Sequence, residues 1–161
     1  MKFLIPYFKG RGVPDWNTSA KAAFADVTLA TTRRELLKAL MEGIFLELKN
    51  QIETFRQYVS PERIFASGGL TRSAALGQLL ADTTGLPICI RDDKESTAWG
   101  AYLIARTGMG DFASVDEACR SLLREETATV FTPDAGRHAL YEKKRARMNA
   151  YYRRTQGTDP V

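Results

Sequence analysis

Cysteine and histidine are scarce in this sequence of 161 residues, and their scarcity excludes two kinds of stabilising site. The two cysteines, Cys89 and Cys119, lie far apart, and His138 is the single histidine. A disulfide framework or a zinc site needs several such residues at short, regular spacing. We therefore expect two buried thiols, no structural metal and a reducing compartment such as the cytoplasm.

Long apolar runs are also missing. The N-terminal run stops at Pro6, which makes it too short for the hydrophobic region of a secretory signal. The longest later run, residues 98–105, is far below the roughly 20 residues that a membrane-spanning helix needs. These limits predict that the protein has no membrane partner.

The sequence also lacks a large excess of basic over acidic residues, or of acidic over basic ones. The sequence has 23 basic and 19 acidic residues, which gives a net charge of +4. Seven basic residues and one acidic residue fall in the segment 137–154, so the rest of the chain is slightly acidic. A basic patch confined to one segment does not indicate a polyanion-binding surface over the whole molecule.

The basic segment 137–154 also carries tyrosines, and it has two interpretations. Basic and aromatic side chains could neutralise phosphates and stack on nucleic-acid bases. Alternatively, an amphipathic helix could dock Tyr141, Met148 and Tyr152 on the domain while its basic groups remain in water. We favour the docked helix and expect no nucleic-acid partner.

The sequence otherwise has an ordinary globular composition, 44% hydrophobic and 26% charged. A chain of this length can fold as one domain that buries about two-thirds of its unfolded surface. Residues 1–31 contain scattered glycine, proline and aromatic residues, which predicts a packed loop segment.

A long amphipathic helix is predicted after Thr32. Thr32 and Glu35 form a capping-box pattern, and apolar residues follow at three- and four-residue spacing. These apolar residues are Leu37, Leu40, Met41, Ile44, Leu48, Ile52, Phe55 and Val59. Gly43 costs about 1 kcal/mol relative to alanine inside a helix, so we expect another backbone to pass close to it.

The middle of the chain alternates strand and helix signals. Strand-like runs over 63–66 and 88–90 each precede a predicted helix, one ending before Gly85 and one over about 94–106. The alanine, glycine and aromatic content of the second helix predicts burial on several sides. A helix capped by Ser114, a strand over 129–131 and a basic helix from Asp134 complete the pattern.

This alternation predicts an α/β fold, with 32–131 as its α/β part and 132–156 as a basic C-terminal helix. Two or three short strands make an incomplete sheet for this length. We therefore expect part of the fold to be missing from this chain.

The turn at Gly68 and Gly69 is the first candidate for ligand binding. A turn without β-carbons lets a ligand reach backbone N–H groups, and the helix that follows offers the positive end of its dipole. Ser73 could add a hydroxyl there. A bare glycine pair is more often only a tight turn, because it matches neither G-x-G-x-x-G nor G-x-x-x-x-G-K-[ST].

Acid–base chemistry has no comparable candidate in this sequence. The aspartates and glutamates fall mostly at predicted loops and helix caps, where acidic residues are favoured for structural reasons. His138 lies in the first turn of a basic helix without a nearby nucleophile pattern. We interpret it as a surface or packing residue and not as a general base.

Five segments, taken in order, carry a family resemblance. Residues 3–17 match F-x-P-Y-x-x-G…P-x-W-[DN], and residues 35–44 match a second signature. Residues 64–73, followed by 78–82, are similar to the G-G-[GA]-x-x-S adenosine motif. Residues 95–101 fit E-x-x-A-x-G-A-A, and residues 133–141 fit P-D-x-x-R-H-x-x-Y. Together these segments resemble the C-terminal part of the FGGY carbohydrate kinases.

The resemblance implies an actin-like, ribonuclease-H-type ATPase fold, in which two α/β domains close on ATP, Mg²⁺ and a sugar or polyol. This chain would hold part of the C-terminal domain, with a short mixed sheet and flanking helices. The nucleotide-binding residues implied by the motifs are Gly68, Gly69, Leu70 and Ser73. The implied hinge residues are Glu95 and Gly100.

The resemblance places the catalytic base and the sugar site in an N-terminal portion that this sequence lacks. It therefore implies no catalytic residue and no metal ligand here, and a chain that is inactive alone. Ala22 and Asp26 stand where the family prefers glycine, and Gly10-Arg11-Gly12 replaces G-E-R. The alternative interpretation is a truncated kinase relative that acts as an oligomerisation or protein-interaction module. A homo-oligomer is expected.

Overall fold

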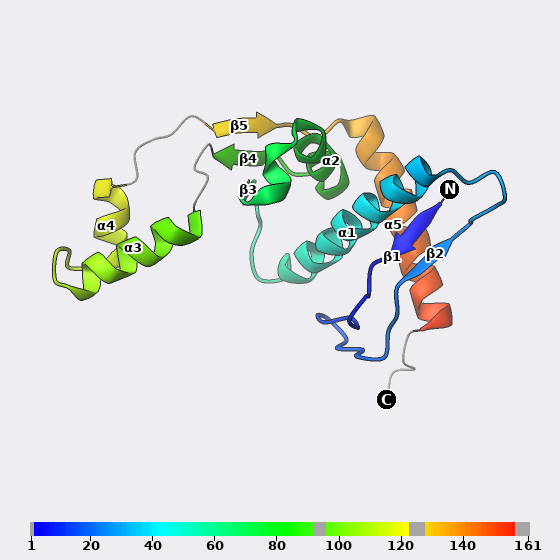
Figure 1. The fold of residues 1–161 in the computed structure, drawn as a ribbon, viewed down its shortest axis with the longest axis horizontal. Coiled ribbons are helices and arrows are strands. Elements are labelled where there is room, and N and C mark those ends of the chain that lie inside the picture. Colours follow the sequence, from blue (N-terminus) through cyan, green and yellow to red (C-terminus); the bar gives the residue numbers. More distant parts are fainter. Residues whose placement is uncertain (1, 92–95, 123–127, 157–161) are drawn as a thin grey trace.

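The computed structural model describes residues 2–91, 96–122 and 128–156 (Figure 1). Its strands are β1 (Phe3–Ile5), β2 (Ala23–Ala25), β3 (Ile64–Ala66), β4 (Ile88–Arg91) and β5 (Ala128–Phe131). Its helices are α1 (Arg33–Phe55), α2 (Ala74–Thr84), α3 (Ser96–Gly108), α4 (Val115–Leu122) and α5 (Ala135–Thr155). A short 3₁₀ turn, η1 (Gly69–Arg72), lies between β3 and α2. The predicted α/β fold with a short mixed sheet is confirmed.

Two small sheets organise the chain. Strands β1 and β2 pair antiparallel, so the segment 1–31 is not wholly a loop as predicted. The other sheet has the order β3-β4-β5, with β3 parallel and β5 antiparallel to β4. Phe65 and Val130 lie on one row of this sheet and are 65% and 55% exposed. Cys89 lies between them in the same row and is buried, so this face of the sheet is exposed on its two outer strands and covered at the centre.

Helix α1 begins as predicted, with a complete capping box between Thr32 and Glu35. A β-carbon on Gly43 would clash with the carbonyl oxygen of Leu4, which confirms the expected close backbone. The predicted apolar stripe is only partly internal, because Leu37 is 61% and Phe55 56% exposed. The buried residues of α1 include several polar ones, Glu42, Glu47, Lys49 and Asn50.

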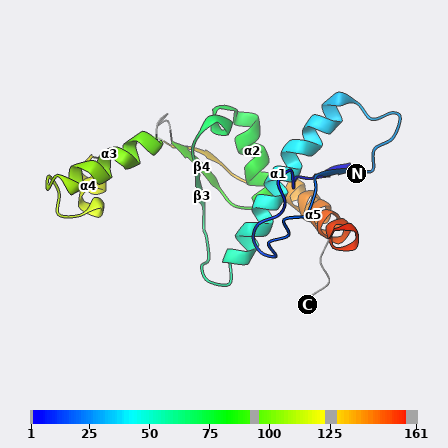
Figure 2. The same ribbon diagram turned by 60° about the horizontal axis from the view of Figure 1, so that its bottom comes forward.

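Two hydrophobic clusters lie on different sides of α1. The first joins the N-terminal segment to α1 and α5 through Phe3, Ile5, Leu46, Met148 and Tyr152. The second joins α1 and α2 to the three-stranded sheet. Figures 1 and 2 show α1 running between α2 on one side and β1 and α5 on the other. Helix α1 is thus packed from several directions, which explains why its buried surface is not one stripe.

The basic helix α5 docks on the domain as predicted, since Met148 and Tyr152 are buried and Tyr141 packs against the same cluster. One detail of that prediction is wrong. Lys144 does not remain in water but is buried and forms an ion pair with buried Glu42. A buried lysine is tolerated when a carboxylate lies beside it.

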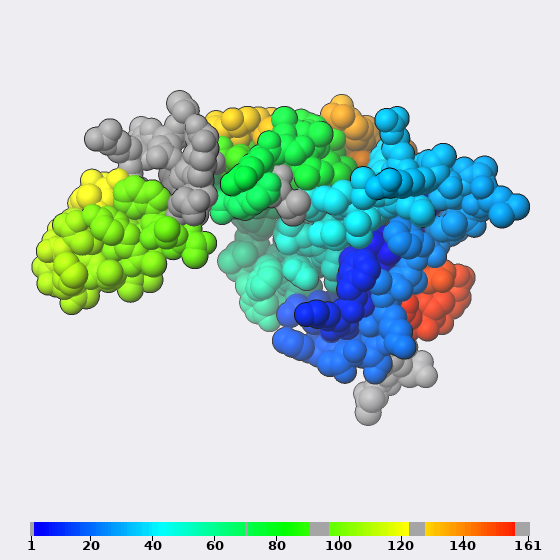
Figure 3. Space-filling model, in the orientation of Figure 1, coloured from blue at the N-terminus to red at the C-terminus, as the bar shows by residue number. Residues whose placement is uncertain are grey.

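Helices α3 and α4 pack on each other and stand apart from the rest of the molecule in both ribbon views. The space-filling view shows them as a separate lobe (Figure 3). Burial of α3 on several sides was predicted, and the structure contradicts it. Leu103 is buried, whereas Trp99, Tyr102 and Ile104 are 39%, 42% and 64% exposed. The cysteine prediction is half right, because Cys89 is buried and Cys119 is only partly buried.

Candidate functional site

The candidate site is the turn that connects β3 to α2. Gly68 has φ 98° and ψ −173°, a conformation that residues with a β-carbon rarely adopt. The turn η1 follows, and Thr71 closes it by donating from its backbone N–H and its Oγ1 to the Gly68 carbonyl, at 3.1 and 2.7 Å. Helix α2 then begins after Ser73.

This turn is open to approach from outside. Gly68 and Gly69 are exposed, and a β-carbon on either would meet no other atom within 4 Å in the part of the chain that the structure describes. Ser73 is the N-cap residue of α2, yet its side chain makes no capping hydrogen bond. Uncapped N–H groups at a helix start can donate to the oxygen atoms of an anion or a ribose. The turn therefore offers backbone donors and a hydroxyl to a ligand.

The structure brings four of the predicted site residues together. Gly68, Gly69, Leu70 and Ser73 all lie within the segment that joins β3 to α2. Gly100 lies instead on α3, in the lobe formed with α4, and a β-carbon there would meet no other atom of the described residues within 4 Å. Glu95 falls outside the described residues.

Helix α2 is anchored at its far end by Asp82, a buried residue that sequence reasoning had noted only as part of a motif. Its carboxylate accepts hydrogen bonds from Gln78 Nε2 at 2.8 Å and from the backbone N–H of Asp134 at 2.9 Å. Arg137 Nε lies 3.0 Å from the same carboxylate. These contacts join α2 to the start of α5 and hold the helix that follows the glycine turn.

His138 has a packing role in this junction, as interpreted from the sequence. Its Nδ1 lies 3.0 Å from the Asp82 carbonyl oxygen. Its ring lies so close to Gly85 that a β-carbon there would clash, and Gly85 caps α2 in the left-handed conformation. The imidazole therefore covers the C-terminal end of α2.

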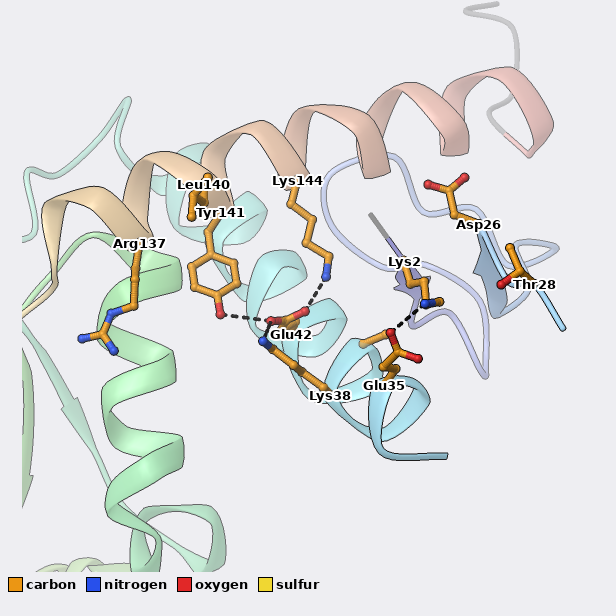
Figure 4. Close-up of a pocket in the computed structure, with 11 residues that line it drawn as sticks. Lys2, Asp26, Thr28, Glu35, Lys38, Glu42, Arg137, Leu140, Tyr141 and Lys144 are labelled. Carbon is orange, nitrogen blue, oxygen red and sulfur yellow. Dashed lines mark hydrogen bonds and ion pairs between the residues drawn. The ribbon is translucent and has the colours of Figure 1, made fainter. Parts of the chain in front are cut away.

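A cavity of about 740 Å³ lies elsewhere, between α1, α5 and the segment around β1 and β2 (Figure 4). None of the glycine-turn residues lines it. Its lining is Lys2, Asp26, Thr28, Glu35, Lys38, Ala39, Glu42, Arg137, Leu140, Tyr141 and Lys144. Sequence reasoning missed this cavity, because its residues come from three segments far apart in the chain.

Glu42 is the buried centre of the cavity wall. Its carboxylate accepts a hydrogen bond from the Tyr141 hydroxyl at 3.0 Å and pairs with Lys144, while Lys38 Nζ lies 3.8 Å away. Burial and the neighbouring Glu42 charge raise the pKa of Tyr141 above its ordinary value. Nearer the rim, hydrogen bonds from Lys2 and from Thr32 lower the pKa of Glu35 to about 2. The carboxylate of Glu35 is therefore ionised at neutral pH.

No group of three or more His, Cys, Asp or Glu residues in the described part of the chain could hold a metal ion. No helix that the structure describes is both long and apolar enough to cross a bilayer.

The profile of the FGGY family of carbohydrate kinases, C-terminal domain, matches residues 2–109. Glycerol kinase from Lactococcus lactis subsp. lactis (strain IL1403) is 26% identical over 150 residues, which cover 92% of this chain and 30% of that protein. Glycerol kinase 1 from Thermotoga maritima is 27% identical, with 87% of this chain and 29% of that protein covered. The chain thus spans less than a third of the length of these relatives.

Solved structures of kinases share the fold. Xylulose kinase from Lactobacillus acidophilus superposes with a TM-score of 0.79 at 24% identity, covering 95% of this chain and 31% of that protein. Plasmodium falciparum glycerol kinase, solved with ADP, gives a TM-score of 0.76 at 26% identity, with coverages of 96% and 31%. The structure is therefore part of an actin-like ATPase fold. The chain belongs to the FGGY family of carbohydrate kinases and corresponds to part of its C-terminal domain.

Proposed function

We propose that this chain is the nucleotide-binding portion of an ATP-dependent carbohydrate kinase. The complete enzyme would transfer the γ-phosphoryl group of ATP to a hydroxyl of a sugar or polyol. The observation that carries the proposal is the open turn, where Gly68 has a positive φ and Gly69 leaves room for ligand atoms. The likeness to a glycerol kinase solved with ADP supports the same assignment.

Each turn residue has a specific role in this proposal. Backbone N–H groups around Gly69 and Leu70 would donate to oxygen atoms of the nucleotide. The Ser73 hydroxyl, which caps no helix N–H, would lie near the adenosine part. Mg²⁺ would be held mainly by the nucleotide phosphates, since the described residues lack a cluster of metal ligands. Mg²⁺ neutralises phosphate charge during transfer.

The hinge assignment extends this proposal to α3. Its exposed Trp99, Tyr102 and Ile104 would become buried against the N-terminal portion of a complete kinase. Gly100 would then allow close packing at a position where a β-carbon meets no other described atom within 4 Å in this chain. Glu95 keeps its proposed hinge role from the family motif alone, and a cytoplasmic location likewise stays a prediction from cysteine usage.

Nucleotide titration by calorimetry tests the proposal directly. ATP and ADP with Mg²⁺ would be titrated into the native chain and into Gly69→Val. We expect weak binding to the native chain and none to the variant, whose thermal midpoint should be unchanged because the β-carbon at 69 enters open space. Equal binding to both proteins would show that the nucleotide does not use this turn.

The chain alone should not catalyse phosphoryl transfer. Loss of a catalytic base costs about 10² to 10⁴ in rate, before loss of the sugar site is counted. Mixing the chain with the N-terminal portion of a related glycerol or xylulose kinase should restore sugar-dependent ATP consumption. If both pieces are folded and form a complex but no consumption appears, the kinase assignment is wrong.

A second candidate function is an oligomerisation or protein-interaction module. The exposed apolar residues of α1 and α3 favour it, because such surfaces often mark interfaces. Sedimentation over a range of concentrations distinguishes the two. Dimerisation without nucleotide binding supports the module, whereas nucleotide binding by a monomer supports the kinase portion.

A further inference from the structure

The cavity between α1 and α5 has a wall that the proposed kinase function does not use. At its centre lie two buried ionic groups, Glu42 and Lys144, whose side chains are 4% and 7% exposed. Removing two charges from water is costly, and such pairs are weak contributors to stability. An ion pair of this kind that faces a cavity is therefore a candidate for a ligand contact. The charges of the other lining residues show which ligand would fit.

The charges of the lining do not cancel. Four cationic residues, Lys2, Lys38, Arg137 and Lys144, face three anionic ones, Asp26, Glu35 and Glu42. Two of these seven are matched by residues outside the lining, because Arg147 lies 2.7 Å from Asp26 and Asp82 lies 3.0 Å from Arg137. Lys2 pairs with Glu35 and Lys144 with Glu42. One positive charge remains in the cavity.

Lys38 carries this remaining charge. Its Nζ lies 3.8 Å from Glu42, whose carboxylate is already in closer contact with Lys144 and Tyr141. The Lys38 side chain is 70% exposed, and Figure 4 shows it beside Glu42 and Tyr141 at the cavity wall. An ammonium group has three donors, so Lys38 can donate to a ligand without losing a short contact.

The acidic groups of the lining indicate which ligand groups could lie away from Lys38. The carboxylates of Glu35 and Glu42 accept hydrogen bonds only and have spare lone pairs beside their present partners. They would repel an anion placed against them but would accept hydrogen bonds from hydroxyl groups. A suitable ligand therefore has an anionic end near Lys38 and hydroxyls elsewhere.

From this arrangement we propose that the cavity between α1 and α5 is a second ligand site, separate from the glycine turn, which binds a small anionic polyol through Lys38, beside the ion pair of Lys144 and Glu42. A volume of about 740 Å³ is within the range of small-molecule sites and holds a phosphorylated triose or hexose with its water. This inference does not depend on the kinase proposal.

The test compares three probes, sn-glycerol 3-phosphate, inorganic phosphate and glycerol, by calorimetry and by two-dimensional amide NMR of the chain. We expect the phosphorylated polyol to bind at least fivefold more tightly than either fragment, and to shift the amide signals of Lys38, Leu140 and Tyr141 but not that of Gly69. Equal affinity for phosphate would overturn the polyol part of the proposal, and shifts centred on Gly69 would overturn the site.

Variants of Lys38 and Lys144 test whether these residues contribute to ligand binding. Lys38→Met should weaken binding about tenfold, the loss expected for a hydrogen bond to a charged group. It should leave the fold intact, because the side chain is mostly exposed. Lys144→Met should weaken binding further where its circular dichroism shows it folded. Lys143→Met is the matched control, since Lys143 is exposed and does not line the cavity. Native affinity in Lys38→Met would refute the proposal.

Discussion

At the scale of single residues, three glycines of this chain differ in whether the fold requires glycine at their positions. Gly43 is required by space, because the Leu4 carbonyl occupies the position of its β-carbon. Gly68 is required by backbone conformation, because its φ is 98°. Gly69 is constrained by neither, since its surroundings are open and its φ is ordinary. The fold itself therefore does not require a glycine at position 69.

Replacement of two helical glycines by alanine should change the free energy of unfolding in opposite directions. Gly43→Ala should lower the free energy of unfolding by about 1–3 kcal/mol, because the β1 backbone must move away from α1. Gly100→Ala should raise it by up to about 1 kcal/mol, because α3 has open space there and alanine favours helix. Urea denaturation measures both. Destabilisation by Gly100→Ala would contradict the open surroundings of α3.

Arg11, which stands where the family's G-E-R segment has glutamate, makes structural contacts in this chain. Its guanidinium lies 4.5 Å from the ring centroid of Tyr152 and 5.3 Å from that of Tyr7. It also forms ion pairs with Asp15 at 3.0 Å and with Glu47 at 3.3 Å. The guanidinium thus lies near the rings of Tyr7 and Tyr152, which pack edge-to-face on each other, while it bridges two carboxylates. These contacts join the N-terminal segment to α1 and α5.

Arg11→Lys should destabilise the chain by about 1–3 kcal/mol, although it keeps the charge. Lysine lacks the planar group that lies near the rings and cannot bridge two carboxylates in the same way. Chemical denaturation of the variant would be compared with that of Arg33→Lys, an exposed control at the start of α1. A loss no larger than that of the control would mean that the guanidinium contacts of Arg11 add nothing to stability.

At the scale of elements, α1 differs from the simple amphipathic helix that its apolar spacing predicts. It buries polar side chains because each finds a partner on another element. Lys49 Nζ donates to the Thr84 carbonyl at the end of α2 at 2.7 Å. Glu47 accepts from Tyr7 Oη at 2.8 Å, and burial together with this carboxylate raises the pKa of Tyr7. Helix α1 thus connects α2 to the N-terminal segment through hydrogen bonds as well as apolar contacts.

The cap of α1 should make stability depend on pH. Hydrogen bonds from Lys2 and Thr32 lower the pKa of Glu35 from its ordinary 4.5 to about 2. A depressed pKa stabilises the fold above about pH 4.5, and this stabilisation is lost as the pH falls toward 2. Glu35→Gln should therefore be less stable than the native chain at neutral pH, and the gap should close near pH 2.

Thermal unfolding of both proteins between pH 2 and 7 checks this prediction, with Glu62→Gln as an exposed control outside the cap. A gap that stays constant over the whole range would contradict the role of the Glu35 charge.

At the scale of the whole molecule, the body packed around α1 has more buried apolar contacts than the projecting lobe of α3 and α4. The body is held by two hydrophobic clusters around α1, whereas α3 and α4 pack chiefly on each other (Figures 1 and 3). A helix pair with few buried apolar contacts opens at low free-energy cost. The lobe should therefore be the least protected helical part of this chain.

Amide hydrogen exchange should reveal this difference. Amides of α3, including Leu103, should exchange at least tenfold faster than those of α1 around Leu46, which is fully buried. Addition of an N-terminal kinase portion should slow exchange in α3, if that helix forms part of the interface. Equal protection of the two helices in the isolated chain would contradict the independent lobe.

From residue 32 onward, the sequence alone determined the main helices and strands and their order, whereas β1 and β2 were missed. Caps such as Thr32, Asp134 and Gly85 act through bonds within one turn, so their residue types are sufficient to locate helix ends. The glycine turn was found in the same way, because Gly68, Gly69 and Ser73 are close in sequence. The family could also be recognised, since ordered motifs do not require knowledge of contacts.

The tertiary structure decided which faces are covered and which distant residues meet. Local spacing cannot tell that Leu37 is exposed while Glu42 is buried, because burial depends on the elements that pack against α1. It also cannot bring Lys144 to Glu42 across 102 positions, or leave α3 exposed in a chain that spans under a third of its relatives. Burial and long-range pairing are properties of the assembled chain, and they become visible only when its elements are placed in space.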